Sequence, residues 1–485
     1  MSKQYDLIII GGGSAGLTAA DFARQLKARV ALVEKDRIGG DCNWTGCISS
    51  KALLRAAQAA HDMRTASRFG LVSAEPDVDL RSVMDHVRSV VGEIYAEESP
   101  EALRADGVDV YLGAARFVDP QSVAVGDDVL TARRFLLATG ARPFVPPIEG
   151  LEEVDYLTYE TLWDLESLPQ HLLVIGAGPI GCEMSQAFRR LGSSITLVDA
   201  KDRLLPRDGP DASQALAQVF EAEGIALHLN SPAQRVWQDP AGVHVNAGRH
   251  EVVGDVLLLS AGRRPNVSGL DLGKAGIDYS LQGIPVDEML RTSQKHIYAA
   301  GDCTGGHQFT HYAGWQAAMA VRNALLPRST AGVSDLVPWT TFTDPEVAHA
   351  GLTEAQARAR FSDQVLTHNW PMEQVDRAYT DAAMAGFIKL VHRPNGTLLG
   401  ASIVAPRAGE MIHEWIMALE RGLKVGALSS AIHVYPTYSI ANMQTSMAVR
   451  VEQLLSGMLG RIINGLTQMM RQGTDGWGQA RWVID

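Results

Sequence analysis

Cysteine is scarce in this chain: its 485 residues include only Cys42, Cys47, Cys182 and Cys303. The N-terminus also lacks the longer apolar region and small-residue cleavage site of a signal peptide, so we expect the reducing environment of the cytoplasm. A structural disulfide is not expected there. Cys42 and Cys47 lie close together in the sequence, and a close cysteine pair in such a compartment is typically catalytic or metal-binding.

Long apolar runs and an excess of positive charge are also missing. No run approaches the roughly 18 apolar residues of a transmembrane helix. The net charge of −12 argues against a nucleic-acid partner, because phosphate binding needs clustered Lys and Arg. Hydrophobic residues make up 46% and charged residues 20%, which is ordinary for a globular protein with large cores. The chain length predicts about three domains.

A glycine-rich motif with a distant carboxylate occurs twice at the same internal spacing. The first copy consists of Gly11, Gly13, Gly16 and Glu34, and the second of Gly176, Gly178, Gly181 and Asp199. Each copy follows an apolar run and precedes a helical pattern and a second apolar run, which predicts two β-α-β units and two dinucleotide-binding domains. The glycines let a pyrophosphate approach the backbone at a helix N-terminus. Glu34 and Asp199 stand where a carboxylate accepts hydrogen bonds from a ribose 2′-OH.

The cysteine pair stands beside a predicted helix. Cys42 and Cys47 flank a four-residue segment, and a helical pattern begins around Ser49. Cys47 is therefore predicted just ahead of a helix N-terminus, where a thiolate is stabilised. A zinc half-site is the alternative, but structural zinc needs four ligands in paired spacing, and Cys182 and Cys303 are isolated.

The segment 39–51 has the pattern Gly-Gly-Asp-Cys-x-x-x-Gly-Cys-x-x-Ser-Lys, which resembles the flavin-dependent disulfide reductases, the family of glutathione reductase, dihydrolipoamide dehydrogenase and mercuric reductase. Further matches occur at residues 138–143, 176–183, 261–266, 299–302 and 342–346, and the resemblance covers roughly residues 4–446. It implies an α/β fold with two Rossmann-type domains, which bind FAD and NAD(P), and an α+β C-terminal domain that builds a homodimer.

The resemblance and the proline-rich junction at residues 143–150 together predict four segments. They are an FAD-binding domain formed by residues 1–146 and 267–335, an NAD(P)-binding domain at 147–266, a dimerisation domain at 336–446, and a C-terminal amphipathic helix and tail at 447–485.

The resemblance also implies roles for single residues. Cys47 lies against the flavin as a thiolate that forms a charge-transfer complex, and Cys42 is the outer thiol that exchanges with substrate. Lys51 pairs with Glu183 near the flavin N5, and a helix from about His311 points its positive end at the flavin. The residues expected to bind the two cofactors are Gly11, Gly13, Ser14, Ala15, Gly16, Glu34, Lys51, Thr139, Gly140, Gly176, Gly178, Ile180, Gly181, Asp199, Gly262 and Asp302.

One segment departs from the family pattern. Glutathione reductase and dihydrolipoamide dehydrogenase end in a His-Pro-Thr-x-x-Glu type motif, whose His is the acid/base for the outer thiol. Here Tyr435 takes the His position and Ile440 the Glu position. Tyrosine titrates at about 10 and histidine at about 6.5, so Tyr435 is a poor proton shuttle at neutral pH. His433 is an alternative base, and a packing role is the other interpretation of it.

Two further departures concern substrate and cofactor access. Mercuric reductase uses a second cysteine pair near its C-terminus, and this chain has no cysteine after Cys303, so authentic mercuric reduction is not expected. Pro179 replaces the tyrosine that gates the nicotinamide pocket of glutathione reductase, so that gate is absent.

The end of the chain has an apolar stripe at helical spacing. It consists of Val451, Leu454, Leu455, Met458, Leu459, Ile462, Ile463, Leu466 and Met470. A helix packed on the dimer or on its own core is one interpretation, and a helix lying on a membrane surface is the other.

The sequence predicts an NAD(P)H-dependent flavoprotein disulfide oxidoreductase that acts through Cys42 and Cys47 on a thiol, disulfide or metal-type acceptor. NADH is favoured over NADPH because Asp199 would repel a 2′-phosphate, although Lys201 and Arg203 soften this penalty. Two alternatives stay open: a membrane-associated NADH:quinone-type dehydrogenase that uses the flavin directly, and a flavin redox sensor with low turnover.

Overall fold

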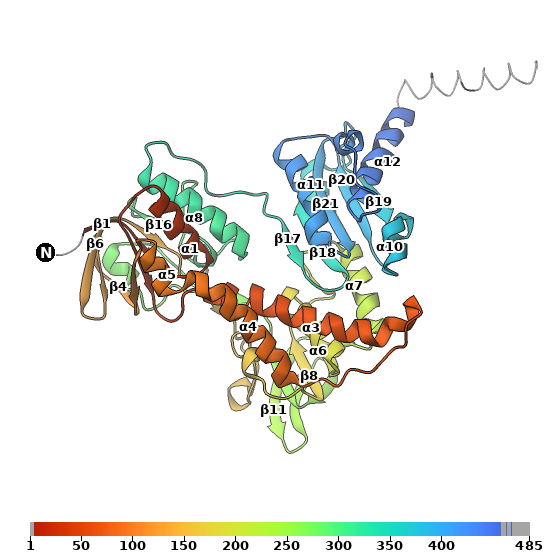
Figure 1. The fold of residues 1–485 in the computed structure, drawn as a ribbon, viewed down its shortest axis with the longest axis horizontal. Coiled ribbons are helices and arrows are strands. Elements are labelled where there is room, and N and C mark those ends of the chain that lie inside the picture. Colours follow the sequence, from red (N-terminus) through yellow and green to blue (C-terminus); the bar gives the residue numbers. More distant parts are fainter. Residues whose placement is uncertain (1–3, 457–461, 463–466, 468–485) are drawn as a thin grey trace, which may run out of the picture. The chain divides into compact units, whose positions relative to one another are not determined.

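The computed structural model describes residues 4–456 together with Ile462 and Thr467. The chain divides into unit 1, Met1–Val337, and unit 2, Pro338–Asp485. Figure 1 shows both units and labels many of their elements. Among the described residues, no helix is long and apolar enough to span a membrane.

The first sheet of unit 1 has the strand order β3-β2-β1-β6-β5-β4, with β16 pairing to β6. Its strands are β1 (Gln4–Ile10), β2 (Val30–Glu34), β3 (Asp109–Leu112), β4 (Ala115–Asp119), β5 (Ser122–Val125), β6 (Asp128–Leu137) and β16 (Ile297–Ala299). The apolar end of β1 is buried on both faces, as in parallel sheets covered on both sides. Helices α1 (Ser14–Gln25) and α8 (Thr310–Leu325) lie side by side (Figure 1), and their buried alanines allow this close approach.

The second sheet of unit 1 is parallel and has the order β10-β9-β8-β14. Its strands are β8 (His171–Ile175), β9 (Ser194–Val198), β10 (Ala226–His228) and β14 (Val256–Leu259), and it is accompanied by α6 (Pro179–Leu191) and α7 (Pro210–Ala222). A three-stranded antiparallel sheet of β11 (Ala233–Asp239), β12 (Gly242–Ala247) and β13 (His250–Gly254) packs its apolar face on the same core. The short strands β7 (Ala141–Pro143) and β15 (Arg263–Pro265) pair where the chain passes between the two sheets.

Four helices follow β2 before the chain returns to the first sheet. They are α2 (Gly40–Trp44), α3 (Cys47–Thr65), α4 (Leu80–Glu98) and α5 (Pro100–Ala105). Short 3-10 turns complete unit 1 at Ala66–Phe69, Leu151–Glu153, Leu162–Asp164, Leu272–Ala275 and Asp302–Thr304. Helix α3 packs on both α4 and α6, so the segment that carries the cysteine pair links the two sheets of unit 1.

Unit 2 is built on one antiparallel sheet with the order β17-β18-β21-β20-β19. Its strands are β17 (Trp339–Thr341), β18 (Glu346–Gly351), β19 (Leu366–Pro371), β20 (Phe387–His392) and β21 (Leu398–Ala405), and its helices are α9 (Glu354–Phe361), α10 (Asp376–Thr380), α11 (Ala408–Glu420) and α12 (Ile440–Ser456), with 3-10 turns at Met372–Gln374 and Val425–Ser430. Helix α11 packs on β18 and β21, and α12 packs on β19 and β20. The buried Trp415 Nε1 donates a 2.7 Å hydrogen bond to Asn442 Oδ1 and thereby joins these two helices.

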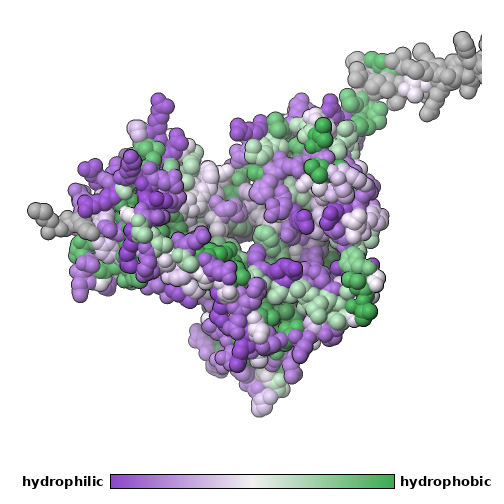
Figure 2. Space-filling view, in the orientation of Figure 1, coloured by the Kyte–Doolittle hydropathy of each residue, from purple (hydrophilic) through white to green (hydrophobic). Residues whose placement is uncertain are grey.

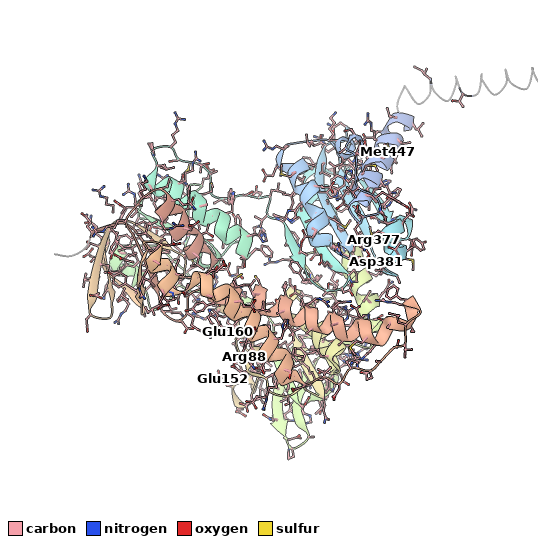
Figure 3. The ribbon with its side chains drawn as sticks, in the orientation of Figure 1. Arg88, Glu152, Glu160, Arg377, Asp381 and Met447 are labelled. Atoms are coloured by element: carbon pink, nitrogen blue, oxygen red, sulfur yellow. The ribbon has the colours of Figure 1, made fainter. Side chains whose placement is uncertain are left out.

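An apolar groove lies along α12. It has a volume of about 840 Å³ and is lined by His368, Trp370, Met443, Gln444, Met447, Ala448, Val451, Glu452 and Leu455. Met447 is labelled in Figure 3, and Figure 2 shows apolar side chains gathered near this end of α12. The predicted apolar stripe begins in this groove, but its members after Leu455, apart from Ile462, lie outside the described residues.

Two predicted helix starts need correction. Helix α3 begins at Cys47 rather than around Ser49, because the chain is already turning at Gly46. Helix α12 begins at Ile440 rather than after about Ser446, since the buried side chains of Ala441 and Asn442 anchor its first turn. The predicted α/β class is confirmed, with parallel sheets in unit 1 and an α+β arrangement in unit 2.

Candidate active site

The two glycine-rich loops of unit 1 have matching geometry. Gly11 and Gly176 have φ of +112° and +113°, a region that favours glycine. A Cβ on Gly16 would lie 1.8 Å from the carbonyl oxygen of Gly11, and a Cβ on Gly181 would lie 1.8 Å from that of Gly176. Both loops therefore require glycine for the close approach of helix to strand, and both lead into a helix N-terminus that suits a pyrophosphate.

The two predicted ribose-binding carboxylates are also held alike. Glu34 accepts hydrogen bonds from the backbone N–H groups of Gly12 (2.6 Å) and Asp36 (2.8 Å). Asp199 accepts them from Ala177 (2.5 Å) and Lys201 (2.6 Å). Each carboxylate is thus fixed at the end of its strand next to its glycine loop.

The cysteine pair sits on two successive helices. Cys42 is in α2 and Cys47 is the first residue of α3, whereas the sequence predicts Cys47 just ahead of a helix. Cys47 Sγ lies 3.1 Å from Oγ1 of Thr310, the first residue of α8. Helix N-termini stabilise thiolates, and here two of them meet at one sulfur.

The two thiols are hydrogen-bonded to each other. The hydrogen bond with Cys47 lowers the pKa of Cys42 to about 6, and the same bond raises the pKa of Cys47 above its usual range. Hydroxyl groups of Thr310 and Ser14 also lower the pKa of Cys42, while Thr310 and the positive charge of Lys51 lower that of Cys47. A pair that holds one negative charge near neutral pH is suited to nucleophilic thiol exchange.

Lys51 and Glu183 form an ion pair between α3 and α6, with Nζ 2.9 Å from Oε2. Glu183 is only 5% exposed, so the acidic member of this pair is shielded from solvent. The pair lies one helical turn after Cys47 on one side and two residues after Gly181 on the other. It therefore connects the thiol pair with the second glycine loop.

A half-buried arginine, Arg263, contacts acidic groups that the sequence interpretation did not bring together. Arg263 Nη2 lies 2.5 Å from Asp41 Oδ2 and 3.1 Å from Asp302 Oδ2, and its guanidinium stands 5.1 Å from the ring centre of Tyr159. Burial raises the pKa of both carboxyl groups, and the charge of Arg263 opposes this shift. The arginine thus links the residue before Cys42 to Asp302.

Several other predicted cofactor residues flank the short strands β7 and β15. Thr139 and Asn266 exchange two hydrogen bonds, from Thr139 Oγ1 to the Asn266 carbonyl (2.7 Å) and from Asn266 Nδ2 to the Thr139 carbonyl (3.0 Å). The Gly262 carbonyl accepts from the Phe144 N–H at 2.9 Å. The remaining ones are Ser14 and Ala15 in the first turn of α1, Gly140 before β7, and Ile180 in the first turn of α6.

Cys182 and Cys303 are fully buried and stand apart from the pair. Burial raises the pKa of both thiols, that of Cys303 to about 11. Their sulfurs donate to backbone carbonyls, Cys182 to Ala177 (3.4 Å) and Cys303 to Ala300 (3.3 Å). They behave as small core residues. Among the described residues, no three His, Cys, Asp or Glu side chains gather as metal ligands.

Tyr435 and His433 lie in unit 2 and have separate acidic partners. Tyr435 Oη donates to Asp376 Oδ2 at 2.8 Å, which raises the pKa of Tyr435. His433 Nε2 lies 2.8 Å from Glu414 Oε2. Burial acts to lower the pKa of His433, but its hydrogen bonds to Glu414 and to the backbone outweigh this and raise it.

The acidic partners of this segment lie on α10 and α11. Nearby, Tyr438 donates to Asp381, which also pairs with Arg377, and these two residues of α10 and its end are labelled in Figure 3. The sequence interpretation missed Glu414 and Asp376 because both are distant along the chain. The available signal for Glu414 was an acidic side chain on α11, a helix with the buried residues Met411, Ile412 and Trp415.

Comparisons with known proteins agree with this geometry. The family model described as pyridine nucleotide-disulphide oxidoreductase matches residues 5–319, and the model of its dimerisation domain matches residues 337–444. This chain belongs to the pyridine nucleotide-disulphide oxidoreductase family. The fold class and the recognised family are thereby confirmed.

Relatives cover nearly the whole chain. It is 36% identical over 439 residues to a mercuric reductase from Bacillus cereus, covering 89% of this chain and 69% of the relative. It is 34% identical over 471 residues to a dihydrolipoyl dehydrogenase from Thermus scotoductus, covering 93% and 99%. The solved structure of the HOCl-induced flavoprotein disulfide reductase RclA from Escherichia coli, as a Cu(II) complex, matches with a TM-score of 0.84 at 28% identity and covers 92% and 100%.

This oxidoreductase is therefore an NAD(P)H-dependent flavoprotein that uses FAD, as its family does, and its dimerisation domain supports a homodimer. The residues present fit the two cofactors. Both glycine loops form cradles that a Cβ would fill. Glu183 is buried in α6, and the half-buried Asp302 begins the 3-10 turn after β16. The individual roles of the site residues remain predictions.

Proposed function

We propose that this oxidoreductase reduces a thiol-exchanging acceptor, a disulfide or a thiol-binding metal ion, through Cys42 and Cys47. The observation that carries this proposal is the position of Cys47 at the N-terminus of α3, with its sulfur 3.1 Å from Thr310 at the N-terminus of α8 and with Cys42 as a hydrogen-bond partner. An acceptor that took electrons directly from the flavin would need no such pair. NADH is the proposed electron donor.

The residues of this chain have distinct tasks in that reaction. FAD, when bound, relays two electrons from NADH to the Cys42–Cys47 disulfide. The first glycine loop and Asp302 would hold FAD, and the second loop and Asp199 would hold the nicotinamide nucleotide. The Lys51–Glu183 pair fixes the position of α3, which begins at Cys47, against α6, which follows the second glycine loop.

Thiol exchange then proceeds in two displacement steps. The Cys42 thiolate attacks one sulfur of the acceptor disulfide, the S–S bond breaks, and the first product leaves as a thiolate. The Cys47 thiolate next attacks Cys42 Sγ, which restores the Cys42–Cys47 disulfide and releases the second product. Each leaving thiolate takes up one proton, so a proton-exchanging group at Cys42 accelerates both steps.

Neither Tyr435 nor His433 stands in the family motif as its His–Glu pair does. Tyr435 donates to Asp376 and its pKa is raised, so it is a weak proton acceptor at neutral pH. His433 with Glu414 is chemically closer to that pair, and it is the alternative base. Because Tyr435 takes the position of the family's catalytic His, we expect dihydrolipoamide and glutathione disulfide to be poor substrates.

A screen of acceptors with wild type and Cys42→Ser tests the proposal. We expect Cys42→Ser to lose disulfide and metal-ion reduction, because the first displacement needs its sulfur. NADH oxidation by a quinone should persist in the same variant and serves as the internal control for folding and cofactor content. Full activity of Cys42→Ser with every acceptor would instead establish the flavin-direct, quinone-type alternative.

A further inference from the structure

Residues 431–438 of unit 2 form neither helix nor strand, and they connect the 3-10 turn Val425–Ser430 with the loop before α12. We call this segment the strap. Among the described residues, no backbone–backbone hydrogen bond involves positions 432–437. Ile432 is fully exposed and Val434 is 75% exposed, so these two side chains add little packing energy. The strap is therefore held mainly by its polar side chains.

Two side chains tie the middle of the strap to helices of unit 2. His433 Nε2 lies 2.8 Å from Oε2 of Glu414 on α11. Tyr435 Oη donates a hydrogen bond to Oδ2 of Asp376 on α10, also at 2.8 Å. The tyrosine is an uncharged donor at neutral pH, whereas the histidine can be neutral or positively charged there. The charge of His433 therefore decides how firmly the strap is held on α11.

Both ring nitrogens of His433 face oxygen atoms that accept hydrogen bonds. Nδ1 lies 3.1 Å from the Ala431 carbonyl oxygen, and Nε2 faces the Glu414 carboxylate. A neutral imidazole has only one N–H, so one of these contacts would set a lone pair against an oxygen, whereas the imidazolium donates at both nitrogens. Carboxyl groups of glutamate ordinarily titrate at about 4.3 and imidazole at about 6.5, so the proton of such a pair resides on the imidazole. These contacts fit the protonated ring.

The surroundings of His433 favour its positive charge. Burial acts to lower the pKa of His433, but the hydrogen bonds to Glu414 and Ala431 and the negative charge of Glu414 outweigh burial and raise it. Glu414 is the charged group that faces the ring from α11. The other acidic groups bound to the strap, Asp376 and Asp381, accept hydrogen bonds from its tyrosines.

The same contacts leave His433 poorly suited to act as a base. Its side chain is 11% exposed, and each of its nitrogens already has an oxygen partner. A general base needs a free lone pair within hydrogen-bond reach of the proton that it removes. Tyr435, two positions later, is 63% exposed and is thus the accessible polar group of the strap.

We propose that His433 is a positioning residue of the strap: as an imidazolium bound to Glu414 it holds the strap, and with it Tyr435, on α11, and it is not the base of thiol exchange. Because folding raises the pKa of His433, the stability that this tie contributes is complete below about pH 6.5 and is lost as the pH rises through the raised pKa. The effect on turnover rests on the proposed thiol exchange, whereas the charge of His433 can be measured without turnover.

The ring signals of histidine in the holoenzyme test the charge. Protein labelled with ¹³C at histidine Cε1 is titrated by NMR from about pH 5.5 to 9, a range around the ordinary imidazole pKa, and the His433 signal is the one that His433→Gln lacks. We expect its midpoint above about 6.5, and a fall of roughly one pH unit in Glu414→Gln, because a charge-assisted hydrogen bond is lost.

His413 provides the matched control, since it is exposed and precedes Glu414 on α11. His413→Gln should leave the His433 midpoint unchanged. A wild-type midpoint at or below about 6.5 would overturn the proposal, as would a midpoint that Glu414→Gln does not lower.

Turnover with a small disulfide at about pH 7 separates a positioning role from a base. His433→Arg keeps a cation opposite Glu414 but cannot accept a proton at this pH. We expect its turnover within about threefold of wild type, whereas the loss of a base costs about 10²-fold or more. His433→Lys is the second cationic variant if arginine does not fold there, and FAD content with quinone reduction reports folding.

A double substitution shows whether His433 acts through Tyr435. His433→Gln should lower disulfide turnover by less than about tenfold, which is below the usual contribution of a base. This loss should be absent in a Tyr435→Phe background, because the two changes then affect one group. Turnover that falls by about 10²-fold or more in the cationic variant and in His433→Gln, with quinone reduction intact, would instead identify His433 as the base.

The proposed function and this inference fail in different ways. If thiol exchange is not the reaction, Cys42→Ser keeps its disulfide turnover, while the titration of His433 is unaffected. If His433 is the base, Cys42→Ser and the His433 variants all lose disulfide turnover, and the proposed function stands without the positioning role.

Discussion

Asp199 is the residue on which the choice between NADH and NADPH depends. Its carboxylate is held by the N–H groups of Ala177 and Lys201, at the position where it accepts hydrogen bonds from a ribose 2′-OH and repels a 2′-phosphate. The sequence left open that Lys201 and Arg203 soften this preference. In the structure Arg203 is engaged with Asp202 (3.7 Å) and with the Pro206 carbonyl (3.4 Å), which weakens that alternative.

We therefore expect kcat/KM to be higher with NADH than with NADPH, and the ratio to fall in Asp199→Asn because the repulsion of a 2′-phosphate is removed. Steady-state kinetics with both nucleotides measures this. Glu34→Gln changes the equivalent carboxylate of the first loop and is the control: it should affect FAD content and leave the nucleotide ratio unchanged. A wild-type ratio that favours NADPH tenfold or more, about 1.4 kcal/mol, would contradict the assignment.

At the scale of elements, the two glycine loops allow a paired test. Gly16→Ala and Gly181→Ala each place a Cβ 1.8 Å from a carbonyl oxygen of the preceding strand end, so helix and strand must separate. Overpacking of this kind costs about 1–3 kcal/mol. Gly16→Ala should lose FAD on purification, whereas Gly181→Ala should keep FAD and show a raised KM for NADH.

Flavin absorbance of the purified variants and NADH titration separate the two outcomes. The variants serve as controls for each other, since both place a Cβ 1.8 Å from a backbone carbonyl oxygen but in different loops. Normal FAD content together with a normal KM for NADH in both variants would contradict the assignment of the loops.

The elements that the sequence predicts well are those with a local signal. The strand–glycine loop–helix units at β1–α1 and β8–α6 carry their pattern in consecutive residues, and both formed as expected. Helix α2 has only five residues and thus too little periodicity to reveal itself. The Asp41–Arg263–Asp302 contact and the Glu414 partner of His433 join distant parts of the chain, and periodicity contains no information about such pairs.

At the scale of the whole molecule, the family model for dimerisation ends at residue 444, before most of the groove residues of α12. Met447 and Val451 are 41% and 43% exposed, so this groove is apolar surface that the common dimerisation domain does not require. We expect a chain ending at Ser456 to remain a dimer and to retain NADH oxidation by a quinone. Light scattering on a sizing column, over a dilution series and beside the full chain, measures the dimer. A shift to monomer would mean that the residues after Ser456 hold the two copies together.

Co-sedimentation of both forms with anionic lipid vesicles tests the membrane-surface interpretation of the apolar stripe. Binding of the full chain that is lost in the shortened chain would support it, because an amphipathic segment binds through its buried apolar area.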